Sequence, residues 1–251
     1  MIYWIKTYNK AIYLFILGII IWQLLPKVVT IPSYILPTPL DIIHSFWEEK
    51  EILLFTHLPL TLLESMIGLI ISIVIGFVIA WMMHISVNVE TTIYPWIIIS
   101  QTIPIIVLSP IIIMWLGYGI WAKVFVIFLI SFFPVTMNVF QGLKSVDGEI
   151  IALLQSYGAT KGQIFWKVEI PSAMPFIMAG VKMAAVFSVI GATLGEWLGS
   201  DQGLGFYSRR MTSNLQADSA FASVILLALL GLFLHGTVQL IQNLFFKKYF
   251  R

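Results

Sequence analysis

The chain has 251 residues, of which 59% are hydrophobic and only 10% are charged. A soluble domain is usually about 45 to 50% apolar and about 25% charged, so this composition excludes an ordinary water-soluble protein. The formal net charge of +2 and the scattered basic residues do not indicate nucleic-acid binding, and the lack of cysteine excludes disulfides and thiolate metal sites.

Apolar segments recur along the whole chain. Because a hydrocarbon core of about 30 Å takes roughly 20 apolar residues per helix, we expect an all-α polytopic membrane protein with about six transmembrane helices. These helices are expected at 11–25, 58–83, 92–116, 120–141, 172–194 and 221–245. We expect one membrane domain over 1–251, with its core at 58–245 and a polar loop at 142–171.

The first apolar run is long and has no small-residue cleavage site before Pro26, so we interpret it as a retained span rather than a signal peptide. Orientation follows from Lys and Arg, which are enriched on cytoplasmic flanks. With the N-terminus inside, eight basic residues lie on the inner side: Lys6, Lys10, Lys144, Lys161, Lys167, Lys247, Lys248 and Arg251. Five lie on the outer side: Lys27, Lys50, Lys123, Arg209 and Arg210. This bias predicts cytoplasmic termini in a multi-pass protein of the cell membrane.

The segment after the first span reads "LPTPLDIIHSFWEEKEILLF". Pro37 and Pro39 favour an extended start, and the residues that follow have a two-faced helical pattern. We therefore expect a short amphipathic helix on the outer surface.

The second span, 58–83, carries small residues four apart at Ser72, Gly76 and Ala80, a pattern typical of close helix packing. Glu64 falls near its outer start. A buried ionisable group is costly in a bilayer, so this carboxylate requires a structural or functional reason.

The third span, 92–116, contains Pro104 and Pro110, and we expect both to interrupt it. Interrupted helices are tolerated where neighbouring helices or a water-filled path satisfy the freed carbonyls. We expect the third and fifth spans to line a translocation path, although simple packing geometry explains the prolines equally well. The polar candidates for this path are Gln101, Thr102, Ser109 and Glu196.

The stretch "SYGATKGQIFWKVEIP" belongs to the polar loop at 142–171. Asp147 is placed to cap a first helix, and Gly158 to end it by taking a positive φ angle. Thr160 and Gln163 have the spacing of a capping box for a second helix, which we expect Pro171 to end. One interpretation is a hairpin that lies on the membrane surface. Another is a small exposed tip for a cytoplasmic partner, anchored by the aromatic pair at 165–166.

The last two spans carry isolated polar groups. Lys182 lies about ten residues into the fifth span, and we expect it to snorkel or to pair with the loop. The segment "GEWLGSDQGLGFYSRRMTSNLQADSA" is rich in glycine and polar residues, which indicates an outer loop that begins at the end of the fifth span. His235 in the sixth span is more typical of an interhelical hydrogen bond than of a metal ligand.

The segment "ALLQSYGATKGQIFWKVEIPSAMPFIMAGVKM" resembles the signature loop of ATP-binding-cassette importer permeases. That signature is Glu-Ala-Ala, three residues, Gly, nine residues, then Ile-x-Leu-Pro. The spacing from Gly158 to Pro171 agrees, while Ala152, Leu153 and Leu154 replace the leading Glu-Ala-Ala. The motifs "LPTPLDI", "TLLESMIGLIISIVIG", "QTIPIIVLSPIIIMWLGYG" and "GEWLGSDQGLG" are similar to permeases of nitrate, sulfonate, taurine and thiamine-pyrimidine importers.

The resemblance implies a type I importer permease fold in which the loop forms a cytoplasmic coupling hairpin. It also implies partners: a second copy of the permease, cytoplasmic ATPase subunits that bind ATP and Mg²⁺, an extracytoplasmic binding protein and the bilayer. The residues that would contact the ATPase or shape that contact are Gly158, Ala159, Thr160, Lys161, Gln163, Ile164 and Pro171.

We therefore expect a permease that imports a small polar solute, such as a thiamine pyrimidine precursor, a sulfonate or nitrate. The chain has no Gly-x4-Gly-Lys-Ser/Thr phosphate loop, so we expect a non-catalytic subunit without a cofactor or metal of its own. An ion-gradient-driven transporter predicts repeated halves and paired membrane carboxylates, which the sequence does not show. An intramembrane enzyme needs a motif such as His-Glu-x-x-His, which is also absent.

Overall fold

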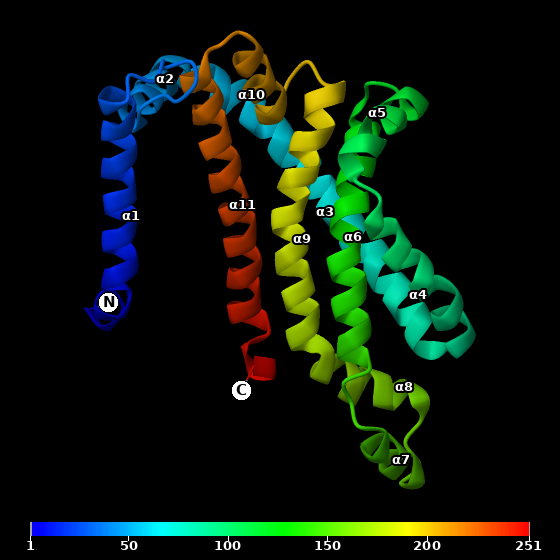
Figure 1. Ribbon diagram of the computed structural model, residues 1–251. Coiled ribbons are helices and arrows are strands. Elements are labelled where there is room, and N and C mark those ends of the chain that lie inside the picture. The colour runs from blue at the N-terminus through cyan, green and yellow to red at the C-terminus, as the bar shows by residue number, and fades with distance from the viewer. Residues whose placement is uncertain (1, 251) are drawn as a thin grey trace.

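The computed structural model describes residues 2–250, with the side chains of residues 10, 12–247 and 249, and these residues form helices without a strand. Figure 1 shows long helices side by side, with short helices at both ends of the array. The α-helices are α1 (Ile2–Val28), α2 (Pro39–Ile52), α3 (Leu58–Ile85), α4 (Val87–Thr102), α5 (Ile105–Leu116), α6 (Ile120–Leu143), α7 (Gly148–Ser156), α8 (Lys161–Ile164), α9 (Ile170–Gly199), α10 (Leu204–Ser213) and α11 (Ala217–Phe245). Two π-turns, η1 (Leu53–His57) and η2 (Phe165–Glu169), and a 3₁₀ turn, η3 (Lys247–Phe250), complete them.

Five of the six expected apolar segments each fall within one helix, and the segment 92–116 is divided between α4 and α5. Four helical stretches of the described chain are long and apolar enough to cross a bilayer: 39–85, 120–143, 161–199 and 217–245. The third expected span is broken, because α4 and α5 meet at an angle of 100°. The apolar part of α1, Ile12–Val28, is shorter than those four. The all-helical polytopic prediction is confirmed, and six spans are reached when the broken pair and α1 each count as one.

Helix α6 lies at the centre, between α3 and α9. Glycines on both neighbours allow this close approach: a Cβ on Gly68 of α3 would lie 2.3 Å from Ile127, and one on Gly191 of α9 would lie 2.7 Å from the same residue. The expected small-residue ladder of α3, formed by Ser72, Gly76 and Ala80, is buried. Its prediction of close packing is confirmed, since a Cβ on Gly76 would lie 3.0 Å from Thr136 of α6.

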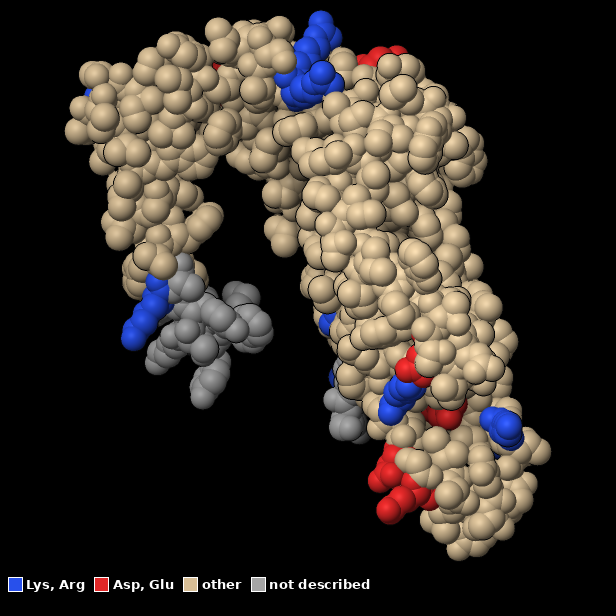
Figure 2. All heavy atoms as spheres, turned by 45° about the vertical axis from the view of Figure 1, so that its right-hand side comes forward, with Lys and Arg blue, Asp and Glu red and all other residues tan. Residues whose placement is uncertain are grey.

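Helix α1 stands apart from this core as an arm that α2 joins to the rest (Figure 1). Near its upper end the indole of Trp22 donates to the Pro37 carbonyl at 3.0 Å, and its ring lies 6.0 Å from that of Phe221. Farther down, large apolar side chains such as Tyr13 and Phe15 are each 70% exposed. Figure 2 shows a wide hollow between this arm and the body of the molecule.

The expected amphipathic helix is present as α2 and lies across the upper end of the array (Figure 1). Thr38 and Asp41 form a capping box, and Pro39 stands at the first helical position, where the lack of an N–H costs nothing. The helix runs on through η1 into α3 rather than ending, so α2 and α3 form one helical rod of 47 residues.

Pro171 does not end a helix, contrary to the expectation. The chain is helical from Lys161 to Gly199, and Pro171 stands in the first turn of α9, directly after η2. In η2 the N–H of Ile170 reaches back five residues to the carbonyl of Phe165. This wider turn moves the carbonyl that the proline ring would strike, so the helix continues. Pro59 follows η1 in the same way.

The glycine-rich outer segment is also more ordered than expected. Instead of a loop, residues 204–213 form helix α10, which packs on α9 and α11 beside the outer ends of both helices (Figure 1). A tight turn at 200–203 joins it to α9, and Gly203 has a φ of +109° there.

Candidate functional site

Two groups of polar contacts lie at the two ends of α9. At the lower end in Figure 1, α7 and α8 form the expected hairpin. The Asp147 carboxylate accepts from the Glu149 N–H at 3.0 Å and caps α7. Gly158 ends the hairpin's first helix with a φ of +83°, and Thr160 and Gln163 close a capping box at the start of α8. These three local predictions are confirmed.

The tip of the hairpin is open to solvent. Gly158, Thr160, Lys161 and Gln163 are exposed, while Ala159 is half-buried. Ile164 is only 4% exposed and anchors α8. Five of the expected residues, 158–161 and 163, therefore lie together at the tip, whereas Ile164 is buried and Pro171 lies in the first turn of α9. Their contact with an ATPase stays a prediction.

One of the two expected aromatic anchors holds the hairpin to the membrane helices. The ring of Phe165 lies 6.4 Å from that of Trp81 and 6.5 Å from that of His84, both on α3. Trp166 is instead 68% exposed. Of the two aromatic residues, only Phe165 anchors the hairpin, and the buried Ile164 contributes beside it.

A hydrogen-bonded pair reinforces this anchor. Nε2 of His84 lies 3.0 Å from Oε2 of Glu169, and the side chains are 16% and 11% exposed. His84 belongs to the last turn of α3 and Glu169 to η2. The pair, which we call the inner latch, joins the root of the hairpin to the lower end of α3.

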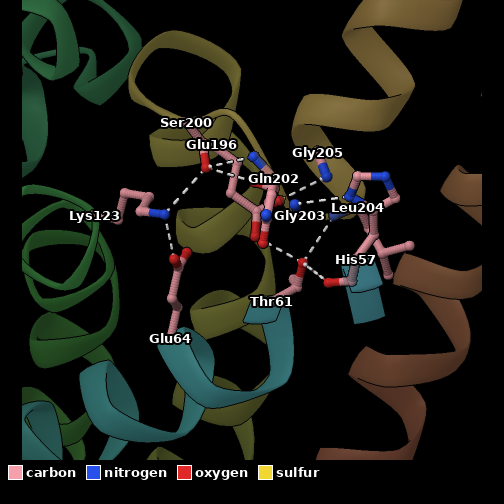
Figure 3. A network of polar contacts seen from close by, with 10 residues as sticks. All are labelled: His57, Thr61, Glu64, Lys123, Glu196, Ser200, Gln202, Gly203, Leu204 and Gly205. Carbon is pink, nitrogen blue, oxygen red and sulfur yellow. Dashed lines mark hydrogen bonds and ion pairs between the residues drawn. The ribbon is translucent and has the colours of Figure 1, made fainter. Parts of the chain in front are cut away.

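At the upper end of α9 a larger network encloses Glu196 (Figure 3). Its Oε1 accepts from the Thr61 hydroxyl at 2.6 Å, and its Oε2 accepts from the Gly205 N–H at 2.6 Å. The same Thr61 oxygen accepts from the Leu204 N–H at 2.9 Å. Glu196 and Thr61 are both fully buried. This outer latch, made of Glu196, Thr61 and residues 203–205, joins α9, α3 and the start of α10.

Gly203 is required at the turn for two reasons. Its φ of +109° is unfavourable for a residue with a side chain, and a Cβ there would lie 2.2 Å from the Glu196 carboxyl carbon. Its N–H donates to Nδ1 of His57 at 3.0 Å, so the buried histidine holds this turn as well.

Next to the outer latch, Lys123 forms an ion pair with Glu64 and donates to the Ser200 hydroxyl at 3.1 Å (Figure 3). The sequence count placed Lys123 on the outer side, which stays a prediction; the structure adds that the residue is only 5% exposed and lies in the first turn of α6. The unexplained Glu64 and the lone lysine at the start of an apolar helix were the signal that could have identified this pair. Buried charges are rarely tolerated without partners.

Helix α10 has a further link to α2. The Tyr207 hydroxyl donates to the Glu49 carboxylate, and the Tyr207 ring lies 5.0 Å from that of His57. Burial raises the pKa of the Tyr207 phenol, and the neighbouring Glu49 raises it further, so the phenol stays protonated as a donor.

The expected path residues lie in two separate places. Gln101, Thr102 and Pro104 are exposed at the break between α4 and α5, whereas Glu196 is enclosed in the outer latch. Pro104 does interrupt the span, as expected. Their lining of a path stays a prediction.

Pro110 lies inside α5, which continues through it, so the expected second interruption is absent from this helix. Proline leaves the carbonyl four residues earlier without its N–H partner, and here that carbonyl belongs to Ile106. The buried Ser109 hydroxyl donates to it at 3.2 Å and compensates for the loss.

Two further polar residues lie on α11 or contact it. Lys182 neither reaches the hairpin nor pairs with it, and instead donates to Oε1 of Gln239 on α11 at 3.1 Å. His235 is half-buried and has no hydrogen-bond partner among the described residues. Within residues 2–250, no group of three His, Asp or Glu side chains is arranged to hold a metal ion.

Comparison with known proteins identifies relatives of the whole chain. Residues 72–250 match the family described as binding-protein-dependent transport system inner membrane component. The chain is 40% identical over 230 residues to the formylaminopyrimidine transport permease protein ThiX of Halalkalibacterium halodurans, and the match covers 92% of each chain. It is 27% identical to the putative aliphatic sulfonates transport permease protein SsuC of Bacillus subtilis, over 90% of this chain and 82% of that one.

A solved structure shares the fold. A chain of the MetNI methionine ABC transporter, in an inward facing conformation, superposes with a TM-score of 0.64 at 18% identity. The match covers 82% of this chain and 97% of the other.

Proposed function

The chain belongs to the family of inner membrane components of binding-protein-dependent transport systems, and from this premise we propose how its parts carry out import. It is a permease subunit of an ATP-driven importer and does not itself catalyse a reaction, because ATP hydrolysis belongs to a separate subunit. An ATPase and a substrate-binding protein are its partners. Family membership thus displaces the two alternatives, the ion-gradient transporter and the intramembrane enzyme.

The hairpin is the contact with the ATPase in this proposal. Its exposed tip carries Gly158, Thr160, Lys161 and Gln163 at and before a short, well-capped helix, with the half-buried Ala159 among them and the buried Ile164 holding the helix in place. Pro171 contributes from the first turn of α9, where it shapes the π-turn at the root. Since Ala152 stands where an acidic residue is usual in the resembling signature, the contact depends on shape more than on charge. ATP and Mg²⁺ are bound by the partner.

The observation that carries this proposal is that the hairpin's second helix and α9 are one helical rod. It runs over 39 residues, from Lys161 at the tip to Gly199 next to the outer latch. A helix of that length extends about 58 Å, which is enough to cross the bilayer from surface to surface. Movement of the hairpin by the ATPase would therefore displace the outer latch directly.

The rod does not move alone. The inner latch at Glu169 and the outer latch at Glu196 both join α9 to α3, and α6 is packed between these two helices. We expect α6, α9 and the upper part of α3 to move as one body, while the inner latch governs how the root of the hairpin moves against the lower end of α3. The broken pair α4–α5 would then be the part against which the body moves, with Gln101, Thr102, Pro104, Ser109 and Pro110 along the path and Glu196 at its outer end.

The membrane orientation follows from the same assignment. If the hairpin faces the ATPase, the lower ends of α1 and α11 in Figure 1, which point to the same side as the hairpin, are cytoplasmic. The extracytoplasmic side then carries α2, α10 and the outer latch, where the binding protein would dock. We further propose that residues 1–251 act as one permease domain and that two copies form the complete permease, with the exposed arm α1 available to the second copy.

For the substrate, we propose a pyrimidine precursor of the formylaminopyrimidine class. The support is the 40% identity to ThiX over 92% of both chains, against 27% to SsuC. A small polar solute of the sulfonate type is the next candidate.

The test is uptake by proteoliposomes that contain the permease and its ATPase, supplied with the binding protein and labelled formylaminopyrimidine. We expect ATP-dependent uptake that aliphatic sulfonates do not compete. Uptake that persists without the ATPase and collapses with the ion gradient would contradict the mechanism, whereas competition by sulfonates would contradict only the substrate.

The coupling role has its own test in Gly158→Trp. Gly158 is exposed at a φ of +83°, so the bulky residue should distort the tip without disturbing the buried core. We expect membrane insertion at the normal level and loss of transport-linked ATP hydrolysis. Gly148→Trp, at an exposed glycine in the first turn of α7, is the matched control.

A further inference from the structure

A cavity of about 610 Å³ lies between the hairpin and the lower end of α3. Apolar side chains make up most of its wall: Phe77, Trp81 and Ile85 from α3, Ile151 from α7, and Phe165 and Trp166 from η2. The mechanism proposed above does not use this space. An apolar cavity of this size is large enough for a ligand rather than for a few water molecules.

The polar residues of the cavity favour an anion. Glu169 also lines it, but the inner latch already pairs that carboxylate with His84 at 3.0 Å. Lys161 lines the cavity too, and no described carboxylate lies within ion-pair distance of its ammonium group. The wall therefore offers an extended apolar surface together with one uncompensated cation.

The residues of the cavity are of the kinds found where a membrane changes from headgroups to hydrocarbon. Its α3 wall, from Phe77 to Ile85, extends about 12 Å along the helix. Trp81 and Trp166 are 40% and 68% exposed, and tryptophan is enriched at membrane interfaces because its ring is amphipathic. Lys161, on the hairpin, is at the polar end of this wall.

We propose that this cavity binds one anionic phospholipid, with an acyl chain against Phe77 and Trp81 and the phosphate at Lys161. The proposal rests on the membrane placement given under the proposed function. The lipid would touch α3, η2 and the hairpin at once. It would therefore strengthen the connection that the inner latch makes between α3 and the root of the hairpin. An anionic leaflet would then strengthen the connection between the ATPase contact and the membrane helices.

The experiment uses the permease–ATPase complex in nanodiscs that contain a trace of diazirine-labelled phosphatidylglycerol or phosphatidylcholine with identical acyl chains. Cross-linked peptides are quantified by mass spectrometry for the cavity segments, 77–85 and 161–169. The reference is the exposed face of α11 at Leu229, Leu232 and Phe233. Because one lysine near an anionic membrane contributes about 1 kcal/mol, we expect the phosphatidylglycerol preference to be about fivefold higher in the cavity than on α11.

Two variants sharpen this result. Lys161→Gln should reduce the preference in the cavity to the value on α11. Lys167→Gln is the matched control, because Lys167 lines a different cavity, of about 360 Å³, between α7 and η2, and should leave the preference unchanged. Both readouts are of bound lipid, so they do not require an active transporter.

Three outcomes would overturn the proposal. The first is an equal lipid preference in the cavity and on α11, and the second is an equal loss in the two lysine variants. The third is labelling of the cavity only after the ATPase is removed, which would make a segment of that subunit the occupant. If neither lipid labels α11, the membrane placement itself fails, and the lipid site with it. A failed uptake assay with normal α11 labelling would instead concern the transport function alone.

Discussion

Glu169 and Glu196 stand on the same helical rod, 27 residues and therefore about 40 Å apart, and each joins it to α3. Their surroundings differ. Glu169 is 8% exposed as a residue and makes one hydrogen bond, to a histidine side chain that is itself 16% exposed. Glu196 is fully enclosed, and both of its oxygens accept hydrogen bonds from buried donors.

This difference indicates different tasks for the two latches. A buried carboxylate with satisfied oxygens is expensive to disturb, because every broken bond leaves a polar group without water. The inner pair, at 16% and 11% exposure, keeps some access to water, which can replace part of the hydrogen bonding that the pair loses when it opens. We infer that the outer latch fixes the shape of the outer surface, while the inner latch is the one that can yield during transport.

The largest expected effect comes from removing the outer carboxylate. Glu196→Ala leaves the Gly205 N–H without its acceptor and leaves the Thr61 hydroxyl only the longer bond to the His57 carbonyl at 3.2 Å, which should lower the free energy of unfolding by about 3 kcal/mol. The measurement is thermal unfolding in detergent, where we expect a midpoint lower by about 10 °C. Glu196→Gln keeps one acceptor and should lose less. An unchanged midpoint for Glu196→Ala would remove the distinction between the two latches.

The next effect comes from the turn that the outer latch holds. Gly203→Ala places a methyl group 2.2 Å from the Glu196 carboxyl carbon at a φ of +109°, and we expect a loss of about 2 to 3 kcal/mol. Gly236→Ala is the matched control, because no atom lies within 4 Å of its added Cβ, and alanine in a helix should stabilise by up to about 1 kcal/mol. Equal unfolding midpoints for the two variants would contradict a tightly closed turn.

The two latches also differ in how far the sequence predicts them. The hairpin was predictable, because Asp147, Gly158 and the Thr160–Gln163 box act on backbone within a few residues of themselves. The apolar segments were predictable for the same reason, since hydropathy is a local property.

What could not be predicted depends on contacts between distant positions. Thr61 meets Glu196 across 135 residues, and nothing next to either of them in the chain announces the other. Lys123 looked like a flanking charge because its partner Glu64 lies on another helix. The effect of Pro171 also escaped prediction, since a π-turn that accommodates a proline depends on the packing of η2 against α3.

At the inner latch we expect a smaller effect on stability than at the outer latch, but a larger effect on function. His84→Ala leaves the mostly buried Glu169 carboxylate without its partner but with some access to water, so we expect a loss of about 1 to 2 kcal/mol in the free energy of unfolding. Stimulation of ATP hydrolysis by the loaded binding protein should nevertheless fall several-fold, because the hairpin root is released from α3. His84→Gln, which can still donate to Glu169, should recover part of it.

The control for His84→Ala is Lys144→Ala, which breaks the exposed salt bridge to Glu90 at 2.6 Å on the same side of the molecule. It joins α6 to α4 and does not touch the hairpin, so stimulation should be retained. If both variants lose stimulation equally, the inner latch has no special part in coupling.

The smallest expected effect lies at the hairpin tip. Thr160→Ala removes the side-chain oxygen that accepts from the Gln163 N–H, at a cost of about 1 kcal/mol to α8 alone. Amide hydrogen exchange at residues 161–164 should therefore quicken about fivefold, while exchange in the body of α9 stays unchanged. Thr160→Ser keeps the oxygen and should exchange like the natural chain. Faster exchange that spreads through η2 into α9 would contradict this expectation. It would mean that the inner latch does not separate the motion of the hairpin tip from α9. The connection would then yield first at the tip rather than at His84 and Glu169.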